Sequence, residues 1–104
     1  MGANLIWRPQ APEDLLLIYE FIGLDNPTAA ERLLASIEYK VTLLVDHPRL
    51  GPRRPHLRYG ARVLLEEPYL ILYEIYPDTD DGLVDEVEIV RIVDGRRDLT
   101  NNPF

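Results

Sequence analysis

The chain has 104 residues, of which 46% are hydrophobic and 28% are charged, and its formal net charge at pH 7 is −7. A chain of this length can bury one modest core, so we expect a single domain over residues 1–104. The acidic balance argues against a protein that coats nucleic acid, because phosphate binding depends on Lys and Arg. The chain has no cysteine for disulfide or thiolate chemistry and no apolar run long enough to span a membrane. We therefore expect a cytoplasmic protein without a membrane segment.

The N-terminal part of the chain predicts a short strand and then an amphipathic helix. The apolar run Leu5–Trp7 is the expected strand. A helix is predicted over 12–22, because apolar residues recur with the helical period from Leu15 onward. Pro12 suits the first helical position, and Gly23 offers a natural end.

A second amphipathic helix is predicted to follow after about four residues. Asn26 and Pro27 suit the N-cap and the first helical position. The helical period of apolar residues then continues to the region of Asp46, where the helix must end because the residue before Pro48 avoids helical backbone angles. Two such helices joined by a short turn form a helical hairpin.

The remainder of the chain predicts three strands. Three prolines and two glycines make 47–60 a stiff connection, and β-rich runs follow at Ala61–Leu65, Tyr69–Tyr76 and Val84–Val93. In the last run Val87, Ile89, Arg91 and Val93 are expected to face one side of the sheet. Consecutive strands joined by short turns pair antiparallel. We therefore predict an α+β fold of order β-α-α-β-β-β, an antiparallel twisted sheet with the helical hairpin packed on one face.

Charged residues are sorted along the chain. Residues 47–62 contain five arginines and no acid, whereas residues 63–90 contain nine acids and no base. Arginine suits planar contacts with carboxylate or phosphate groups. Two interpretations stay open, because these arginines can pair with the acidic strands of the same molecule or can form a binding surface. For Arg62 we expect a structural ion pair with Glu74 or Glu88, with contact to a target as the alternative.

Patterns typical of enzymes and metal sites are weak. His47 and His56 lie in the proline-rich connection, where solvated histidines are commoner than metal ligands. The polar turn at 78–82 lacks the ligand spacing of a calcium loop, and Ser36 stands in no nucleophile motif. The tyrosines of the Tyr69–Tyr76 run either pack in the core or form a stacking platform for bases. We predict no catalytic residue, no metal and no cofactor.

Six short motifs follow one another over residues 7–98. They are Ala11-Pro12-Glu13-Asp14-Leu15, Asn26-Pro27-Thr28-Ala29-Ala30, Leu44 to Gly51 with Pro48 between them, Gly60-Ala61-Arg62, Tyr69-Leu70-Ile71-Leu72-Tyr73, and Arg91-Ile92-Val93-Asp94-Gly95-Arg96-Arg97-Asp98. In these motifs and their order the chain resembles the toxins of the RelE/ParE superfamily, and the ParE branch more closely than the RNA-cleaving RelE branch. The resemblance implies the fold predicted above.

The resemblance also implies a function. ParE-like toxins of type II toxin–antitoxin systems poison DNA gyrase, are neutralised by a ParD-like antitoxin, and meet operator DNA only indirectly through that antitoxin. The alternatives are ribosome-dependent mRNA cleavage of the RelE type and a degenerate member that only binds its antitoxin. Three features disfavour RNA cleavage: the net charge is acidic, Asp94 replaces the His common in the closing motif, and Leu99–Phe104 contains no His or Tyr.

Two sets of residues are expected to bind the antitoxin. The first set is apolar and comprises Leu16, Leu17, Phe21 and Leu24. Because residues 15–18 are apolar all round the helix, this helix carries more apolar residues than one buried face requires. The second is basic and would attract an acidic antitoxin tail; it comprises Arg53, Arg54 and Arg58. A further set, with either target contact or a structural role, comprises Arg62, Tyr73, Arg91, Arg96 and Arg97.

Overall fold

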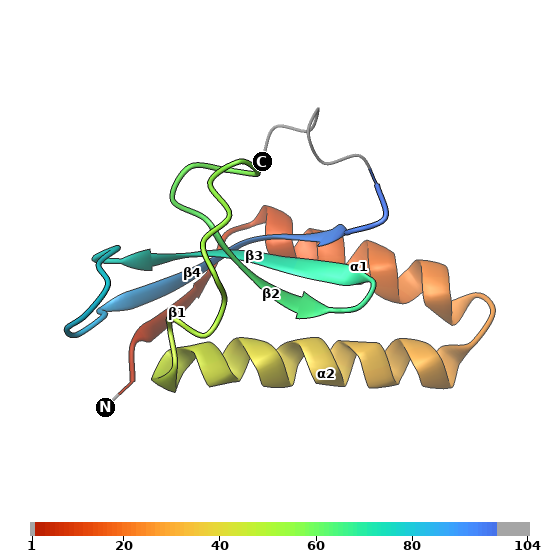
Figure 1. Cartoon of the computed structure of the whole chain (residues 1–104). Coiled ribbons are helices and arrows are strands. Elements are labelled where there is room, and N and C mark those ends of the chain that lie inside the picture. Colours follow the sequence, from red (N-terminus) through yellow and green to blue (C-terminus); the bar gives the residue numbers. More distant parts are fainter. Residues whose placement is uncertain (1, 98–104) are drawn as a thin grey trace.

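A computed structural model describes residues 2–97. Its elements are β1 (Asn4–Trp7), α1 (Gln10–Gly23), α2 (Pro27–Asp46), β2 (Arg62–Glu66), β3 (Tyr69–Tyr76) and β4 (Glu86–Asp94). Figure 1 shows the helical hairpin on one side of the sheet and the connection from α2 to β2 on the other. The predicted α+β fold and element order are confirmed, and the predicted strand boundaries hold to within two residues.

The sheet has the strand order β1-β4-β3-β2. β2 pairs with β3, and β3 with β4, in the predicted antiparallel sense. The prediction of a wholly antiparallel sheet is wrong for β1, which runs parallel to β4 with Asn4 opposite Glu86 and Trp7 opposite Ile89. The two helices lie between β1 and the other strands in sequence, so β1 is free to enter the sheet in either direction. The sheet is therefore mixed.

The second helix has the predicted ends, and the first begins earlier than predicted. The Asn26 side chain accepts a hydrogen bond from the Ala29 N–H (3.0 Å), which caps α2, and the helix ends at Asp46. α1 begins at Gln10 rather than at Pro12. Pro12 is tolerated there because the first four N–H groups of a helix have no partner within the helix.

A β-bulge interrupts the regular alternation that the sequence predicts for β4. Leu72 is opposite Arg91, but Tyr73 is opposite Ile89, so β4 carries one extra residue at this point. After the bulge, Ile92 joins the core beneath the helices, whereas Val93 lies in a cluster on the other face. The predicted alignment of Val87 and Ile89 with Val93 on one face is therefore wrong.

Both faces of the sheet are covered. On the helix face, Leu15 of α1 and Ile37, Val41 and Leu44 of α2 pack on β3 and β4 around Ile71. On the opposite face, which we call the loop face, a smaller cluster around Leu72 is covered by the connection between α2 and β2 (Figure 1). Neither helix of the described residues is long and apolar enough to cross a membrane. The closing segment Leu99–Phe104, where the sequence lacks His and Tyr, lies outside the described residues.

Candidate functional site

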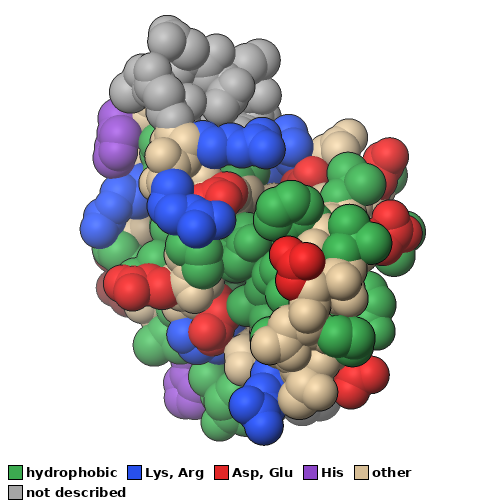
Figure 2. Space-filling model, turned by 90° about the vertical axis from the view of Figure 1, so that its right-hand side faces the viewer, with side chains coloured by type: hydrophobic (Ala, Val, Ile, Leu, Met, Phe, Trp, Pro, Cys, Tyr) green, Lys and Arg blue, Asp and Glu red, His purple; other side chains and the backbone are tan. Residues whose placement is uncertain are grey.

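The outer surface of α1 carries the apolar residues that the sequence assigns to a binding surface. Their exposed fractions are 55% for Leu16, 59% for Leu17, 70% for Phe21 and 85% for Leu24. Figure 2 views the molecule from the side on which α1 ends and α2 begins, and hydrophobic side chains gather there with acidic ones among them. The prediction that these side chains exceed the needs of the core is confirmed. A patch of this kind on a helix typically marks an interaction surface.

The arginines of the connection between α2 and β2 mostly bind within the molecule. Arg49 donates hydrogen bonds to three backbone carbonyls of the turn between β3 and β4 (2.8–3.1 Å). Arg53 pairs with Asp78 at 2.7 Å and Asp80 at 3.0 Å, and Arg58 pairs with Glu74 at 2.6 Å. Of the two interpretations left open by the sequence, intramolecular pairing is therefore confirmed for Arg53 and Arg58.

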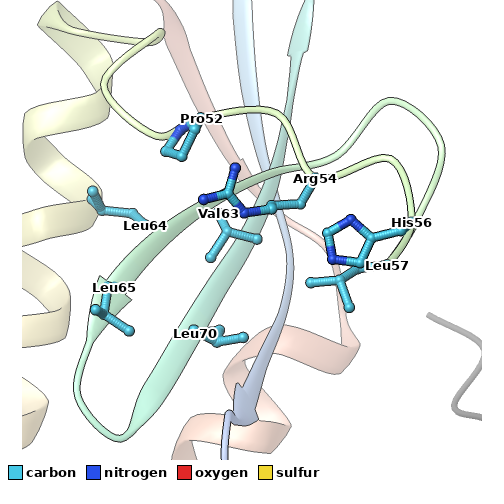
Figure 3. Close-up of a pocket in the computed structure, with 8 residues that line it drawn as sticks. All are labelled: Pro52, Arg54, His56, Leu57, Val63, Leu64, Leu65 and Leu70. Atoms are coloured by element: carbon cyan, nitrogen blue, oxygen red, sulfur yellow. The ribbon is translucent and has the colours of Figure 1, made fainter. Parts of the chain in front are cut away.

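Arg54 differs from its neighbours, because its side chain forms no ion pair with residues 2–97. Within these residues the Arg54 guanidinium donates a single hydrogen bond, to the Arg53 carbonyl (2.9 Å). It lines a pocket of about 570 Å³ together with His56 and Leu57 from the connection and apolar residues of β2 and β3. Figure 3 shows Leu65 and Leu70 at the end of this pocket where the two strands join. The pocket is mainly apolar, with Arg54 and His56 as its basic groups.

A network of charged and polar side chains lies near the Arg58 pair. Arg8, just after β1, donates to Glu88 (2.9 Å) and to Glu74 (3.0 Å), and the Tyr76 hydroxyl donates to the same Glu74 carboxylate. Glu74 is only 8% exposed, and its carboxylate is held by two arginines and a tyrosine. No local sequence pattern indicates this role of Arg8, because its partners lie 66 and 80 residues away.

This network lowers the pKa of Glu74 and raises the pKa of Tyr76. Burial acts to raise the pKa of Glu74, but the hydrogen bonds from Tyr76 and Arg58 and the charge of Arg8 outweigh it, so the pKa lies below 4.5, its ordinary value. The hydrogen bond to the Glu74 carboxylate raises the pKa of Tyr76. Glu74 is therefore a weak base, and Tyr76 keeps its proton at neutral pH.

The lowered pKa of Glu74 predicts a pH-dependent contribution to stability. A carboxyl group whose pKa is lowered by folding stabilises the native state fully above its unfolded pKa, and this contribution is lost as pH falls through the folded pKa. We expect Glu74→Gln to lower the free energy of unfolding at pH 7 and to do so much less at pH 3, measured by urea titration. Glu67→Gln, in the exposed turn, is the control. An equal effect of Glu74→Gln at both pH values would contradict the assignment.

Arg62 and Tyr73 meet the start of the connection at a buried junction. The Tyr73 hydroxyl donates to the Pro48 carbonyl (2.9 Å) and accepts from the Gly51 N–H (2.8 Å), and Arg62 donates to the Gly51 carbonyl (3.0 Å). The predicted ion pair of Arg62 with Glu74 or Glu88 is wrong, because Arg8 and Arg58 take those carboxylates. Arg62 is 6% exposed and Tyr73 is fully buried. The geometry thus favours structural roles for both, and Tyr73 offers no stacking surface.

The three arginines of the closing motif differ in their surroundings. Arg91 donates two hydrogen bonds to the buried Asp14 carboxylate (2.7 and 3.0 Å), which joins β4 to α1. Arg96 is exposed and pairs with Asp94 at 2.7 Å, a contact that lowers the pKa of Asp94 to about 2. Arg97 is exposed at the end of the described residues. Asp94 is thus a partner for Arg96. Among residues 2–97, no three His, Asp or Glu side chains are placed to hold a metal ion.

Comparison with known proteins identifies the family. A family model described as the ParE toxin of the type II toxin–antitoxin system parDE matches residues 5–99. Toxin RelE2 of Caulobacter vibrioides is 31% identical over 90 residues, which cover 86% of this chain and 92% of that protein. A chain in the structure of the chromosomal ParDE system from P. aeruginosa has a TM-score of 0.71 and 27% identity, and the match covers 89% of this chain and 96% of that one. The chain therefore belongs to the ParE toxin family of type II toxin–antitoxin systems.

Proposed function

We propose that this toxin acts by binding DNA gyrase and not by cleaving RNA, and that a ParD-like antitoxin neutralises it. The observation that carries the proposal is the state of the acidic cluster around Glu74. Cleavage of RNA by attack of the 2′-hydroxyl requires a general base with a pKa near the working pH. Glu74 and Glu88 are both engaged by arginines, and the pKa of Glu74 lies below its ordinary value. A binding activity needs no such base.

The proposal predicts opposite results in two purified systems. The toxin should inhibit supercoiling by gyrase and leave ribosome-bound mRNA intact in a translation reaction. In cells it should cause filamentation with DNA damage and not an immediate arrest of translation. Codon-specific cuts in the translation reaction would instead support the RelE-type activity. If the toxin neither inhibits gyrase nor cleaves mRNA but still binds the antitoxin, the result would indicate a degenerate member.

For the antitoxin we propose a docking site on the outer surface of α1. The support is the exposure of Leu16, Leu17, Phe21 and Leu24, which an amphipathic helix laid against α1 would bury. A Leu16→Glu, Phe21→Glu double variant should bind the antitoxin at least about 100-fold more weakly, because two charges would enter an apolar interface. Hydrogen exchange should show protection of α1 in the complex. Protection confined to residues 47–62, with unchanged affinity of the double variant, would contradict the site.

A second contact with an acidic antitoxin segment is proposed at the pocket that contains Arg54 and His56. Of the three arginines expected to bind the antitoxin, Arg53 and Arg58 already pair with carboxylates of the toxin itself. Arg54 therefore supplies the main basic group for a partner at this place, and its replacement by Ala should slow association at low salt. We place operator DNA in contact with the antitoxin only, because the toxin carries a net charge of −7.

A further inference from the structure

Some acidic residues of the toxin are neutralised by ion pairs within residues 2–97, and others are not. In the sheet and its turns, Glu66, Glu74, Asp78, Asp80, Glu88 and Asp94 form ion pairs. Around the exposed apolar residues of α1 stand three acids, Glu13, Glu20 and Asp25. All three are exposed, and none forms an ion pair with any residue between 2 and 97.

These acids lie on the same surface as the apolar patch. Side chains three or four positions apart are neighbours on a helix. Glu13 stands four residues before Leu17, and Glu20 stands three residues after it. The segment from Gln10 to Asp46 contains seven acids and two bases, and so contributes five of the seven units of net negative charge. The exposed side of α1 therefore carries acidic side chains among its apolar ones.

We propose that the partner segment that covers α1 is an amphipathic helix that carries Lys and Arg beside its apolar residues. This rests on the proposed function, in which α1 is the docking site of the antitoxin, and it adds the charge of the segment that docks there. The basic side chains would neutralise Glu13 and Glu20, whereas an acidic segment would face like charges, which costs affinity. The antitoxin would thus present a basic helix to α1, distinct from the acidic segment proposed for Arg54.

The same acids disfavour two other occupants of α1. A second copy of the toxin, docked symmetrically through α1, would bring two acidic surfaces together. An anionic membrane surface would be repelled for the same reason. The acids therefore act as a selectivity element on a surface whose leucines and phenylalanine would otherwise accept any apolar partner.

Two synthetic helical peptides with one shared apolar stripe test the proposal. One carries Lys at the positions beside the apolar residues, and the other carries Glu there. We expect the Lys peptide to bind the intact toxin about tenfold more tightly at low salt, by fluorescence anisotropy, and the preference to shrink at high salt. In a Glu13→Gln, Glu20→Gln variant the preference should disappear. The control variant Glu67→Gln, Asp81→Asn removes the same charge from turns of the sheet and should keep the preference.

The outcomes separate this inference from the proposed function. Equal binding of both peptides, with loss of both in a Leu17→Gln, Phe21→Gln variant, would overturn the basic helix and leave α1 as the docking site. Tighter binding of the Glu peptide, or an unchanged preference in the Glu13→Gln, Glu20→Gln variant, would also overturn it. Failure of both peptides to protect α1 from hydrogen exchange would overturn it as well. Inhibition of gyrase supercoiling tests the proposed target of the toxin, and its result does not depend on the outcome of the peptide experiments.

Discussion

Replacement of Asp14 by Ala should lower the free energy of unfolding by about 3 kcal/mol, because it removes three hydrogen bonds at the buried junction of α1 with β4. The Asp14 carboxylate accepts two hydrogen bonds from Arg91 and a third from the Ile92 N–H (3.0 Å). It is therefore a polar anchor between the N-terminal half of α1 and the sheet. Urea or thermal unfolding of the purified variant measures the loss.

Two further variants test this explanation. Asp14→Asn keeps an oxygen that can accept from the Ile92 N–H but loses the charge opposite Arg91, so its effect should be smaller than that of Asp14→Ala. Asp25→Ala removes an exposed acid that has no ion pair with the described residues, and it should change stability by less than about 0.5 kcal/mol. Equal effects of Asp14→Ala and Asp25→Ala would show that the anchor contributes nothing.

Replacement of Gly51 by Ala should be nearly as costly, at about 2–3 kcal/mol, because the added carbon would overlap backbone atoms of a packed strand. A Cβ at this position would lie 2.4 Å from the Val63 carbonyl oxygen and 2.9 Å from a ring carbon of Tyr73. Gly51 also binds Tyr73 through its N–H and Arg62 through its carbonyl. Moving the backbone aside would therefore break both hydrogen bonds.

Other glycines supply the controls for this prediction. At Gly23, near the end of α1, an added Cβ would meet only Ala30 at an ordinary 3.8 Å, so Gly23→Ala should be neutral or stabilising by about 0.5 kcal/mol. Gly60 has open space but a φ of +84°, and Gly60→Ala should cost about 1 kcal/mol through backbone strain alone. A smaller effect at Gly51 than at Gly60 would contradict the steric explanation.

The sequence predicted those features of the fold that depend on neighbouring residues. Asn26, Pro27 and Pro48 define the ends of α2 because an N-cap, a first-turn proline and a restricted residue before proline act locally. The direction of β1 depends on a partner more than 80 residues away, and no local pattern encodes it. The same holds for the bulge opposite Leu72, which changes the faces of the residues that follow it in β4.

The candidate site was predictable to an uneven degree. The exposure of Leu16 and Leu17 could be predicted because an apolar full turn exceeds one buried face. The pairing of Glu74 with Arg58 and Arg8, and not with Arg62, could not be predicted, because it depends on the path of the connection over the loop face. Residues of the motifs that carry the family resemblance form contacts that hold the fold together. Asp14 contacts Arg91, and Gly51 contacts Tyr73, across different motifs.

The adjacency of β1 and β4 has a consequence for the timing of toxin synthesis. β1 is made first, yet its only strand neighbour in the described sheet is formed by residues 86–94. The nascent chain can form the helical hairpin early, but it cannot complete the sheet until almost all described residues have left the ribosome. The residues of α1 thus leave the ribosome well before the sheet is complete. An antitoxin that docks on α1, as we propose, would meet these residues while the toxin is still being translated.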